Sequence, residues 1–98
     1  MITIGTRRSE RFHMAVPLII CGESQGQRPL REDTHTLILS AYGVLVLLEA
    51  AVRLGQKIVV MNPQNRRERE GTVVYLAPHH QNVVCAGIEF TAPAPDFW

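Results

Sequence analysis

The chain has 98 residues, 46% of them hydrophobic, which predicts one folded domain with a single modest core. A formal net charge of +1 gives no bulk attraction to nucleic acid or to anionic membranes. Two cysteines are too few for the disulfide framework of a small secreted domain, and the N-terminus lacks the pattern of a signal peptide. We therefore expect a soluble, cytoplasmic protein.

Short apolar runs separated by turn signals dominate the chain. They predict six strands, at residues 12–21, 34–39, 44–48, 57–61, 70–76 and 83–90. Turn or loop composition marks residues 21–33, 40–43, 54–56, 62–65 and 78–82. Residues 49–53 favour a short helical turn. Strands at this spacing indicate an all-β protein, either an antiparallel barrel or a sandwich.

Two further segments of the chain bear on its environment. The apolar stretch over residues 37–52 contains Ser40, Gly43 and Glu49 and is shorter than the roughly 20 residues that a spanning helix needs, so we expect no membrane insertion. Residues 91–98 form a Pro-rich tail that ends in Phe97 and Trp98. These two aromatic residues are expected either to dock on the strands or to begin a truncated helix.

Two short motifs stand about thirty residues apart. The segment RRSER at residues 7–11 contains R-x-x-x-R, and arginine side chains bind phosphates bidentately and stack on purine rings. The segment ILSAYG at residues 38–43 contains S-x-x-G, which supplies a hydroxyl and a glycine where backbone can approach closely.

In this order, the motifs resemble the signature of PilZ domains, small bacterial receptors for the second messenger cyclic di-GMP. The segment LGQ at residues 54–56 resembles the family's turn before the fourth strand, and GIEF at residues 87–90 resembles its closing G-V-x-F strand. The resemblance implies a six-stranded antiparallel PilZ-like β-barrel with at most a short helical turn. It divides the single domain 1–98 into an N-terminal arm (1–11), a barrel (12–90) and a tail (91–98).

The resemblance also implies a ligand site. It assigns Arg7 and Arg11 to cyclic di-GMP, with Arg8 as an auxiliary, and it places the Ser40 hydroxyl on the ligand and Gly43 in the loop that approaches the barrel. The family writes its second motif as D/N-x-S-x-x-G, whereas this chain has Ile38 at the position of the Asp or Asn. Because isoleucine offers neither a donor nor an acceptor to a guanine, the sequence predicts a receptor with weakened affinity.

Each of these residues also has a simpler interpretation. The three arginines could be a solvated arm, Ser40 and Gly43 could only shape a turn, and Ile38 could face the core as a strand residue. A PilZ-like domain that has lost its ligand and serves as a protein–protein interaction module therefore remains the main alternative. A small barrel for RNA or single-stranded DNA would need aromatics interleaved on a basic face, which these strands lack, so neither nucleic acid is an expected partner.

The residue pattern gives no support for an enzyme or a metalloprotein. His79 and His80 fall in a predicted turn, without the i, i+4 spacing or the cysteine pairs of metal sites. Ser40 lacks a nearby base and orienting group of the kind that activates a nucleophile. We therefore expect no catalytic residues, no metal and no cofactor other than the signalling ligand.

Overall fold

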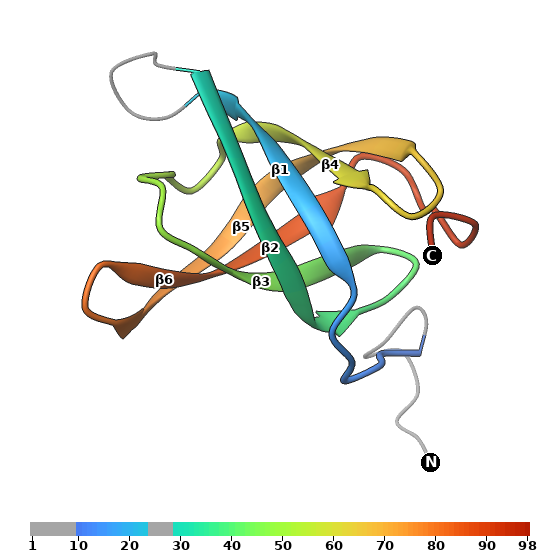
Figure 1. Ribbon diagram of the computed structural model, residues 1–98, viewed down its shortest axis with the longest axis horizontal. Coiled ribbons are helices and arrows are strands. Elements are labelled where there is room, and N and C mark those ends of the chain that lie inside the picture. The colour runs from blue at the N-terminus through green and yellow to red at the C-terminus, as the bar shows by residue number, and fades with distance from the viewer. Residues whose placement is uncertain (1–9, 24–28) are drawn as a thin grey trace.

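A computed structural model describes residues 10–23 and 29–98, and six β-strands form its framework. The strands are β1 (Pro17–Glu23), β2 (Pro29–Leu39), β3 (Gly43–Leu48), β4 (Lys57–Asn62), β5 (Arg67–His80) and β6 (Val83–Phe90). Neighbours pair antiparallel in the order β1-β2-β3-β6-β5-β4, and β1 also pairs with β4, so the sheet closes into a barrel (Figure 1). The predicted all-β, six-stranded antiparallel barrel is confirmed.

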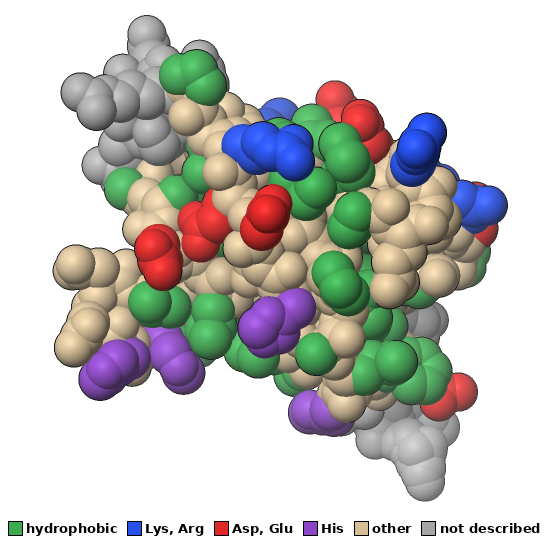
Figure 2. All heavy atoms as spheres, in the orientation of Figure 1, with side chains coloured by type: hydrophobic (Ala, Val, Ile, Leu, Met, Phe, Trp, Pro, Cys, Tyr) green, Lys and Arg blue, Asp and Glu red, His purple; other side chains and the backbone are tan. Residues whose placement is uncertain are grey.

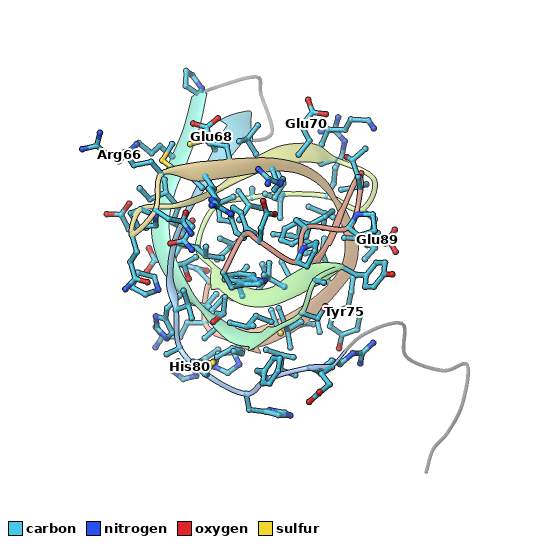
Figure 3. All side chains as sticks on the ribbon, turned by 90° about the vertical axis from the view of Figure 1, so that its right-hand side faces the viewer. Arg66, Glu68, Glu70, Tyr75, His80 and Glu89 are labelled. Carbon is cyan, nitrogen blue, oxygen red and sulfur yellow. The ribbon has the colours of Figure 1, made fainter. Side chains whose placement is uncertain are left out.

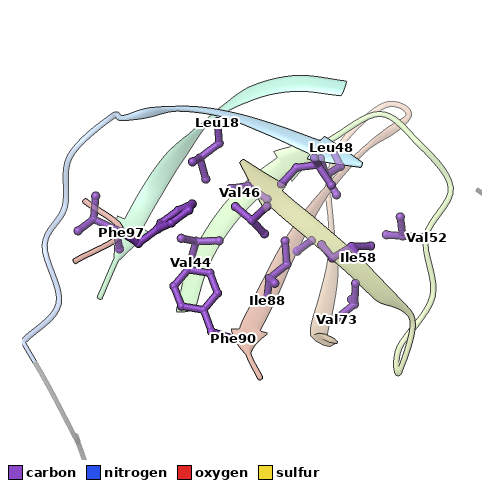
Figure 4. Packing of buried hydrophobic residues seen from close by; sticks show 14 of the residues in the cluster. Leu18, Val44, Val46, Leu48, Val52, Ile58, Val73, Ile88, Phe90 and Phe97 are labelled. Atoms are coloured by element: carbon purple, nitrogen blue, oxygen red, sulfur yellow. The ribbon is translucent and has the colours of Figure 1, made fainter. Parts of the chain in front are cut away.

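The barrel interior is filled by one side chain in two from most strands, as the pleat requires. In β3, Val44, Val46 and Leu48 are buried, whereas Leu45 and Leu47 are half-buried on the outer face. Residues from all six strands, together with the loop after β3 and the C-terminal tail, meet in one hydrophobic cluster (Figure 4). Alternation in β3 shows that its continuous apolar run forms a strand with two unequal faces.

The first two strands are displaced from the predicted ranges. Each residue of β1 pairs with one of β2, from Pro17 opposite His35 to Glu23 opposite Pro29. This hairpin satisfies the backbone donors and acceptors of residues that the Gly and Pro content had assigned to a loop over 21–33. The predicted strand over 12–21 and the predicted loop were therefore wrong in extent, because pairing between the two strands outweighs local composition.

Strand β5 is also longer than the predicted range 70–76, and the predicted turn over 78–82 was too wide. Pro78 and His79 belong to β5, and the register shifts between Pro78 and His80, a bulge of the kind where proline is tolerated in a sheet. The turn to β6 needs only Gln81 and Asn82, and Gln81 takes a positive φ of 51°. A two-residue connection of this kind matches the twist of a hairpin.

The helical turn expected over residues 49–53 is not formed, and the described residues contain no helix. The Glu32 carboxylate accepts hydrogen bonds from the backbone N–H groups of Glu49 and Ala50, at 2.8 and 3.0 Å. Because these donors bind a side chain on β2, the segment leaves β3 as an extended loop. Val52 then turns inward and is buried.

The C-terminal tail packs against one end of the barrel, where the C-terminus lies beside the turn between β4 and β5 (Figure 1). Phe97 is fully buried, and its ring meets those of Phe90 and Trp98 edge to face, with centroids 5.4 and 4.8 Å apart. Asn62 and Asn65 both donate side-chain hydrogen bonds to the Phe97 carbonyl oxygen. Docking of the tail's aromatic residues on the barrel is thus confirmed.

The outer surface over β1 and β2 mixes acidic, basic, histidine and apolar side chains without a continuous basic stripe (Figure 2). Across the two described ranges, no helix is long and apolar enough to cross a membrane.

Candidate functional site

The turn between β2 and β3 holds the second sequence motif. The Ser40 N–H donates to the Gly43 carbonyl at 3.0 Å, and the Ser40 hydroxyl oxygen accepts a hydrogen bond from the Tyr42 N–H at 3.1 Å. Serine side chains commonly close a turn on their own backbone in this way. Since a hydroxyl has one donor and two acceptor positions, this bond leaves the hydroxyl hydrogen for a second partner.

Gly43 begins β3 at a point where the chain lies very close to β6. A Cβ atom built on Gly43 would clash with the carbonyl oxygen of Ile88 and would lie 3.2 Å from the Glu89 Cα. The pairing of Gly43 with Glu89 therefore requires a residue without a side chain. Gly43 has a structural reason to be glycine, independent of any ligand.

The segment that precedes β1, residues 10–16, is attached beside this turn. Phe12 and Leu39 exchange two backbone hydrogen bonds, each 2.9 Å long, in an isolated antiparallel bridge. The Thr36 N–H also donates to the Val16 carbonyl at 3.0 Å, so this segment is held to β2 at two places. The bridge fixes Arg11, the neighbour of Phe12, at the side of the barrel that carries the turn.

A surface pocket of about 420 Å³ lies between Arg11 and the outer face of β2, β3, β6 and β5. Its size falls within the range of about 300–1,000 Å³ that is typical of small-molecule sites. Arg11, Ser40 and Gly43 all line it, although Arg11 is far from the other two in the sequence. The remaining lining residues are Ile38, Leu39, Tyr42, Val44, Leu45, Val74, Tyr75, Gly87, Ile88 and Glu89.

The floor of the pocket has an apolar row that crosses four strands. Cross-strand pairing places Ile38 opposite Leu45, Leu45 opposite Gly87, and Gly87 opposite Tyr75. Gly87 keeps the middle of this row low, because a Cβ atom there would lie only 2.9 Å from the Tyr75 Cβ. Tyr75 is 52% exposed at the end of the row, so its ring presents a surface on which a planar group can stack.

Two β-bulges turn the end residues of this row, Ile38 and Tyr75, to the outer face of the barrel. Thr36 pairs with Val46 and Ile38 with Leu45, so β2 has one extra residue between them; β5 has another between Val73 and Tyr75. Without a bulge, a residue two places after a buried Thr36 or Val73 would also face the core. Bulges commonly redirect side chains beside functional sites, and here both bulges turn a side chain into one pocket.

Ile38 is therefore half-buried at the pocket and does not belong to the buried core. The interpretation of Ile38 as a core-facing strand residue was wrong, because the bulge moves the inward position to Leu39, which is 4% exposed. Ile38 occupies the place where the family motif has an Asp or Asn. The structure thus puts an apolar side chain at the edge of the pocket.

Glu89 also lines the pocket and was not singled out from the sequence. It lies on β6 between the buried residues Ile88 and Phe90 and is exposed on the outer face, opposite Gly43. Figure 3 shows Tyr75 and Glu89 pointing outward from the same side of the barrel wall. The alternation of apolar and polar residues over 87–90 predicts that Glu89 faces outward. Its position beside the β2–β3 turn follows only from the strand order, in which β6 pairs with β3.

The turn is also attached to the C-terminal tail. The Trp98 indole N–H donates to the Ser40 carbonyl oxygen at 2.8 Å, and the Ala94 N–H donates to the Ala41 carbonyl at 2.7 Å. The Phe90 N–H donates to the Tyr42 carbonyl, also at 2.8 Å. Since the tail binds two carbonyls of the turn and β6 binds a third, the geometry of the turn depends in part on the docked tail.

Several residues considered from the sequence lie elsewhere. Arg7 and Arg8 are outside the described residues. Burial raises the pKa of the Cys85 thiol, and both cysteines are free and partly exposed, away from the residues that line the pocket. In the described parts of the chain, no group of three or more His, Cys, Asp or Glu side chains is placed to hold a metal ion.

Comparison with known proteins was made at the level of sequence and of structure. No protein-family model matches the sequence, and no curated protein matches it closely enough to indicate a relationship. Similarity to this chain is instead found among solved structures.

Two of these structures are similar to this chain over more than nine-tenths of its length. One is the Bacillus subtilis inhibitor of motility MotI/DgrA, with a TM-score of 0.69 and 17% identity over 93% of this chain and 45% of that one. The other is the PilZ domain of YcgR from Escherichia coli with c-di-GMP, with a TM-score of 0.64 and 18% identity over 92% of this chain and 81% of that one. The chain thus spans less than half of MotI/DgrA and most of the YcgR domain. The resemblance to PilZ domains is confirmed in the fold, and the chain is a PilZ-like β-barrel.

Proposed function

We propose that this chain is a regulatory receptor domain that binds cyclic di-GMP in the pocket between the N-terminal arm and the β2–β3 turn. The observation that carries the proposal is the convergence of Arg11, Ser40 and Gly43 on one pocket. The similar PilZ domain of YcgR was solved with c-di-GMP, which supports the choice of ligand. The proposed role is recognition and not catalysis, and it belongs in bacterial signalling in the cytoplasm.

The chemistry of the pocket suits this ligand in several ways. Cyclic di-GMP carries two anionic phosphates and two guanine bases. The Arg11 guanidinium can bind a phosphate, or the O6 and N7 atoms of a guanine, with two parallel hydrogen bonds. The Ser40 hydroxyl supplies a further donor, and the apolar row that ends in Tyr75 supplies a surface for a base. We propose that Arg7 and Arg8, in the arm 1–11, add to the positive charge.

A second function is favoured by a specific observation. Ile38 places an apolar side chain where the family has a polar partner for guanine, and Val74 and Tyr75, which line the same pocket from β5, are each more than half exposed. A pocket with an apolar edge of this kind also suits a protein partner. The alternative is therefore a degenerate PilZ-like domain without ligand binding, which acts as a protein–protein interaction module.

Isothermal titration calorimetry with cyclic di-GMP separates the two functions. We expect saturable binding by the wild type and weaker binding by Arg11→Ala and Ser40→Ala. Arg53→Ala is the matched control, because it removes an exposed arginine that does not line the pocket. Absence of binding at ligand concentrations up to about 1 mM, where the binding free energy is only about −4 kcal/mol, would overturn the receptor function and favour the interaction module.

A further inference from the structure

The outer face of the barrel at the pocket consists of two adjacent rows of different chemistry. The first is the apolar row of Ile38, Leu45, Gly87 and Tyr75. The second is polar and contains the β2–β3 turn with Ser40, then Gly43, then Glu89, which pairs with Gly43. Residues two apart on a strand lie about 7 Å from each other, so the rows are separated by roughly the width of a purine.

A base that lies on the apolar row would therefore turn one edge toward the polar row. Gly87 has no side chain, so the middle of this row does not project from the barrel surface. The exposed Tyr75 ring stands next to Gly87 at the end of the row. Gly43 carries no side chain at the position where it pairs with Glu89. The edge of the base would face the Ser40 hydroxyl and the Glu89 carboxylate together.

The two edges of guanine differ in what they need from a protein. The O6 and N7 atoms accept hydrogen bonds and suit an arginine fork, whereas the N1–H and the exocyclic N2 amine are donors and need an acceptor. Ile38 cannot supply that acceptor, but a carboxylate has two oxygens that can receive both donors side by side. Arg11 and Glu89 line the same pocket and offer the two complementary chemistries.

We propose that Glu89 is a guanine-specificity residue of this pocket, accepting hydrogen bonds from the N1–H and the N2 amine of one guanine of the ligand. This inference rests on the proposed cyclic di-GMP function and adds the residue that replaces the missing polar partner at position 38. An adenine presents an acceptor at N1, which a carboxylate repels, so Glu89 also disfavours cyclic di-AMP. The carboxylate lowers the attraction for phosphates and raises selectivity among the bases.

The test compares ligands that differ by one group. Wild type, Glu89→Gln and the control Glu70→Gln are titrated with cyclic di-GMP and with its inosine analogue, which lacks the N2 amine. Glu70 is an exposed glutamate on β5 that does not line the pocket (Figure 3). We expect Glu89→Gln to weaken cyclic di-GMP binding by about 5- to 150-fold, the range for an unpaired buried donor. The loss with the inosine analogue should be clearly smaller, and Glu70→Gln should change neither affinity.

Each outcome distinguishes the inference from the function on which it rests. If the wild type binds cyclic di-GMP and Glu89→Gln binds it equally well or more tightly, the carboxylate is not an acceptor for guanine; the receptor function stands and this inference falls. Equal losses with the two ligands would likewise exclude a bond to the N2 amine. If the wild type does not bind cyclic di-GMP, the function and the inference fall together. Because Glu89 is exposed, an unchanged melting temperature for Glu89→Gln is expected and shows that folding is not the cause.

Discussion

At the scale of single residues, Ile38 marks the departure of this chain from the ligand-binding pattern of PilZ domains. A bulge in β2 turns its side chain from the core to the pocket, so a polar residue at this position would meet the ligand and solvent. The effect of a carboxylate on stability at this position therefore differs from its effect at a core position. A carboxylate in the barrel core would cost several kcal/mol, whereas one at the edge of the pocket would keep its hydration.

The substitution Ile38→Asp should tighten cyclic di-GMP binding by about 1–3 kcal/mol, because it adds an acceptor for the donors of the guanine that Glu89 does not bind. We expect the melting temperature to change little, since Ile38 is outside the buried core. Calorimetry and thermal unfolding of the same samples measure the two effects. A sharply lowered melting temperature without a gain in affinity would contradict the placement of Ile38 at the pocket and would favour the interaction module.

The substitution Arg11→Lys keeps the positive charge but removes the planar fork. If Arg11 binds phosphate or guanine bidentately, this variant should lose nearly as much affinity as Arg11→Ala, about 10- to 150-fold for a hydrogen bond to a charged group. Thermal stability should barely change, because Arg11 is exposed. Equal affinities of Arg11→Lys and wild type would mean that Arg11 contributes only diffuse charge.

At the scale of elements, the bulges in β2 and β5 explain what the sequence could and could not predict. Apolar runs and turn residues predicted the six strands, and the last strand was placed at residues 83–90 as observed. Alternation alone could not place Ile38 or Tyr75, because a bulge reverses the facing of every residue beyond it. The meeting of Glu89 with the β2–β3 turn depends on strand order, which local patterns do not encode.

The β2–β3 turn is held against β6 by a close approach at Gly43, and this predicts a stability effect. Gly43→Ala should lower the free energy of unfolding by about 1–3 kcal/mol, since its Cβ would clash with the Ile88 carbonyl and a strand must shift. Gly22→Ala is the control on another strand, where the nearest atom is a movable methyl of Ile58 at 3.3 Å. Denaturant unfolding should show the larger loss for Gly43→Ala. Equal losses would mean that the close approach at β6 is not a constraint.

At the scale of the whole molecule, the C-terminal tail completes the barrel and reaches the candidate site. Phe97 closes the core beside Phe90, while Trp98 and Ala94 hold the backbone of the β2–β3 turn. The ion pairs of Asp96 with Arg67 and Arg69 are largely exposed, and pairs of this kind contribute little to stability. The buried aromatic ring is therefore the main anchor of the tail.

Truncation of this anchor should destabilise the entire barrel. Phe97→Ala is expected to cost about 3–5 kcal/mol of unfolding free energy, the range for a fully buried phenylalanine. Leu54→Ala is the control, because Leu54 is 61% exposed and its truncation should cost less than about 0.5 kcal/mol. Denaturant unfolding measures both values. A small cost for Phe97→Ala would show that the tail is not part of the cooperative core.

Binding of cyclic di-GMP between Arg11 and the β2–β3 turn can be tested by nuclear magnetic resonance of the backbone amides. Titration of the labelled protein should shift the amide signals of Arg11, Ser40, Gly43 and Glu89, which all belong to residues lining the pocket. The signals of Ile20 and Val60, buried on the paired strands β1 and β4 and outside the pocket lining, should stay in place. Unmoved signals at saturating ligand, or shifts confined to β1 and β4, would exclude binding of cyclic di-GMP in this pocket.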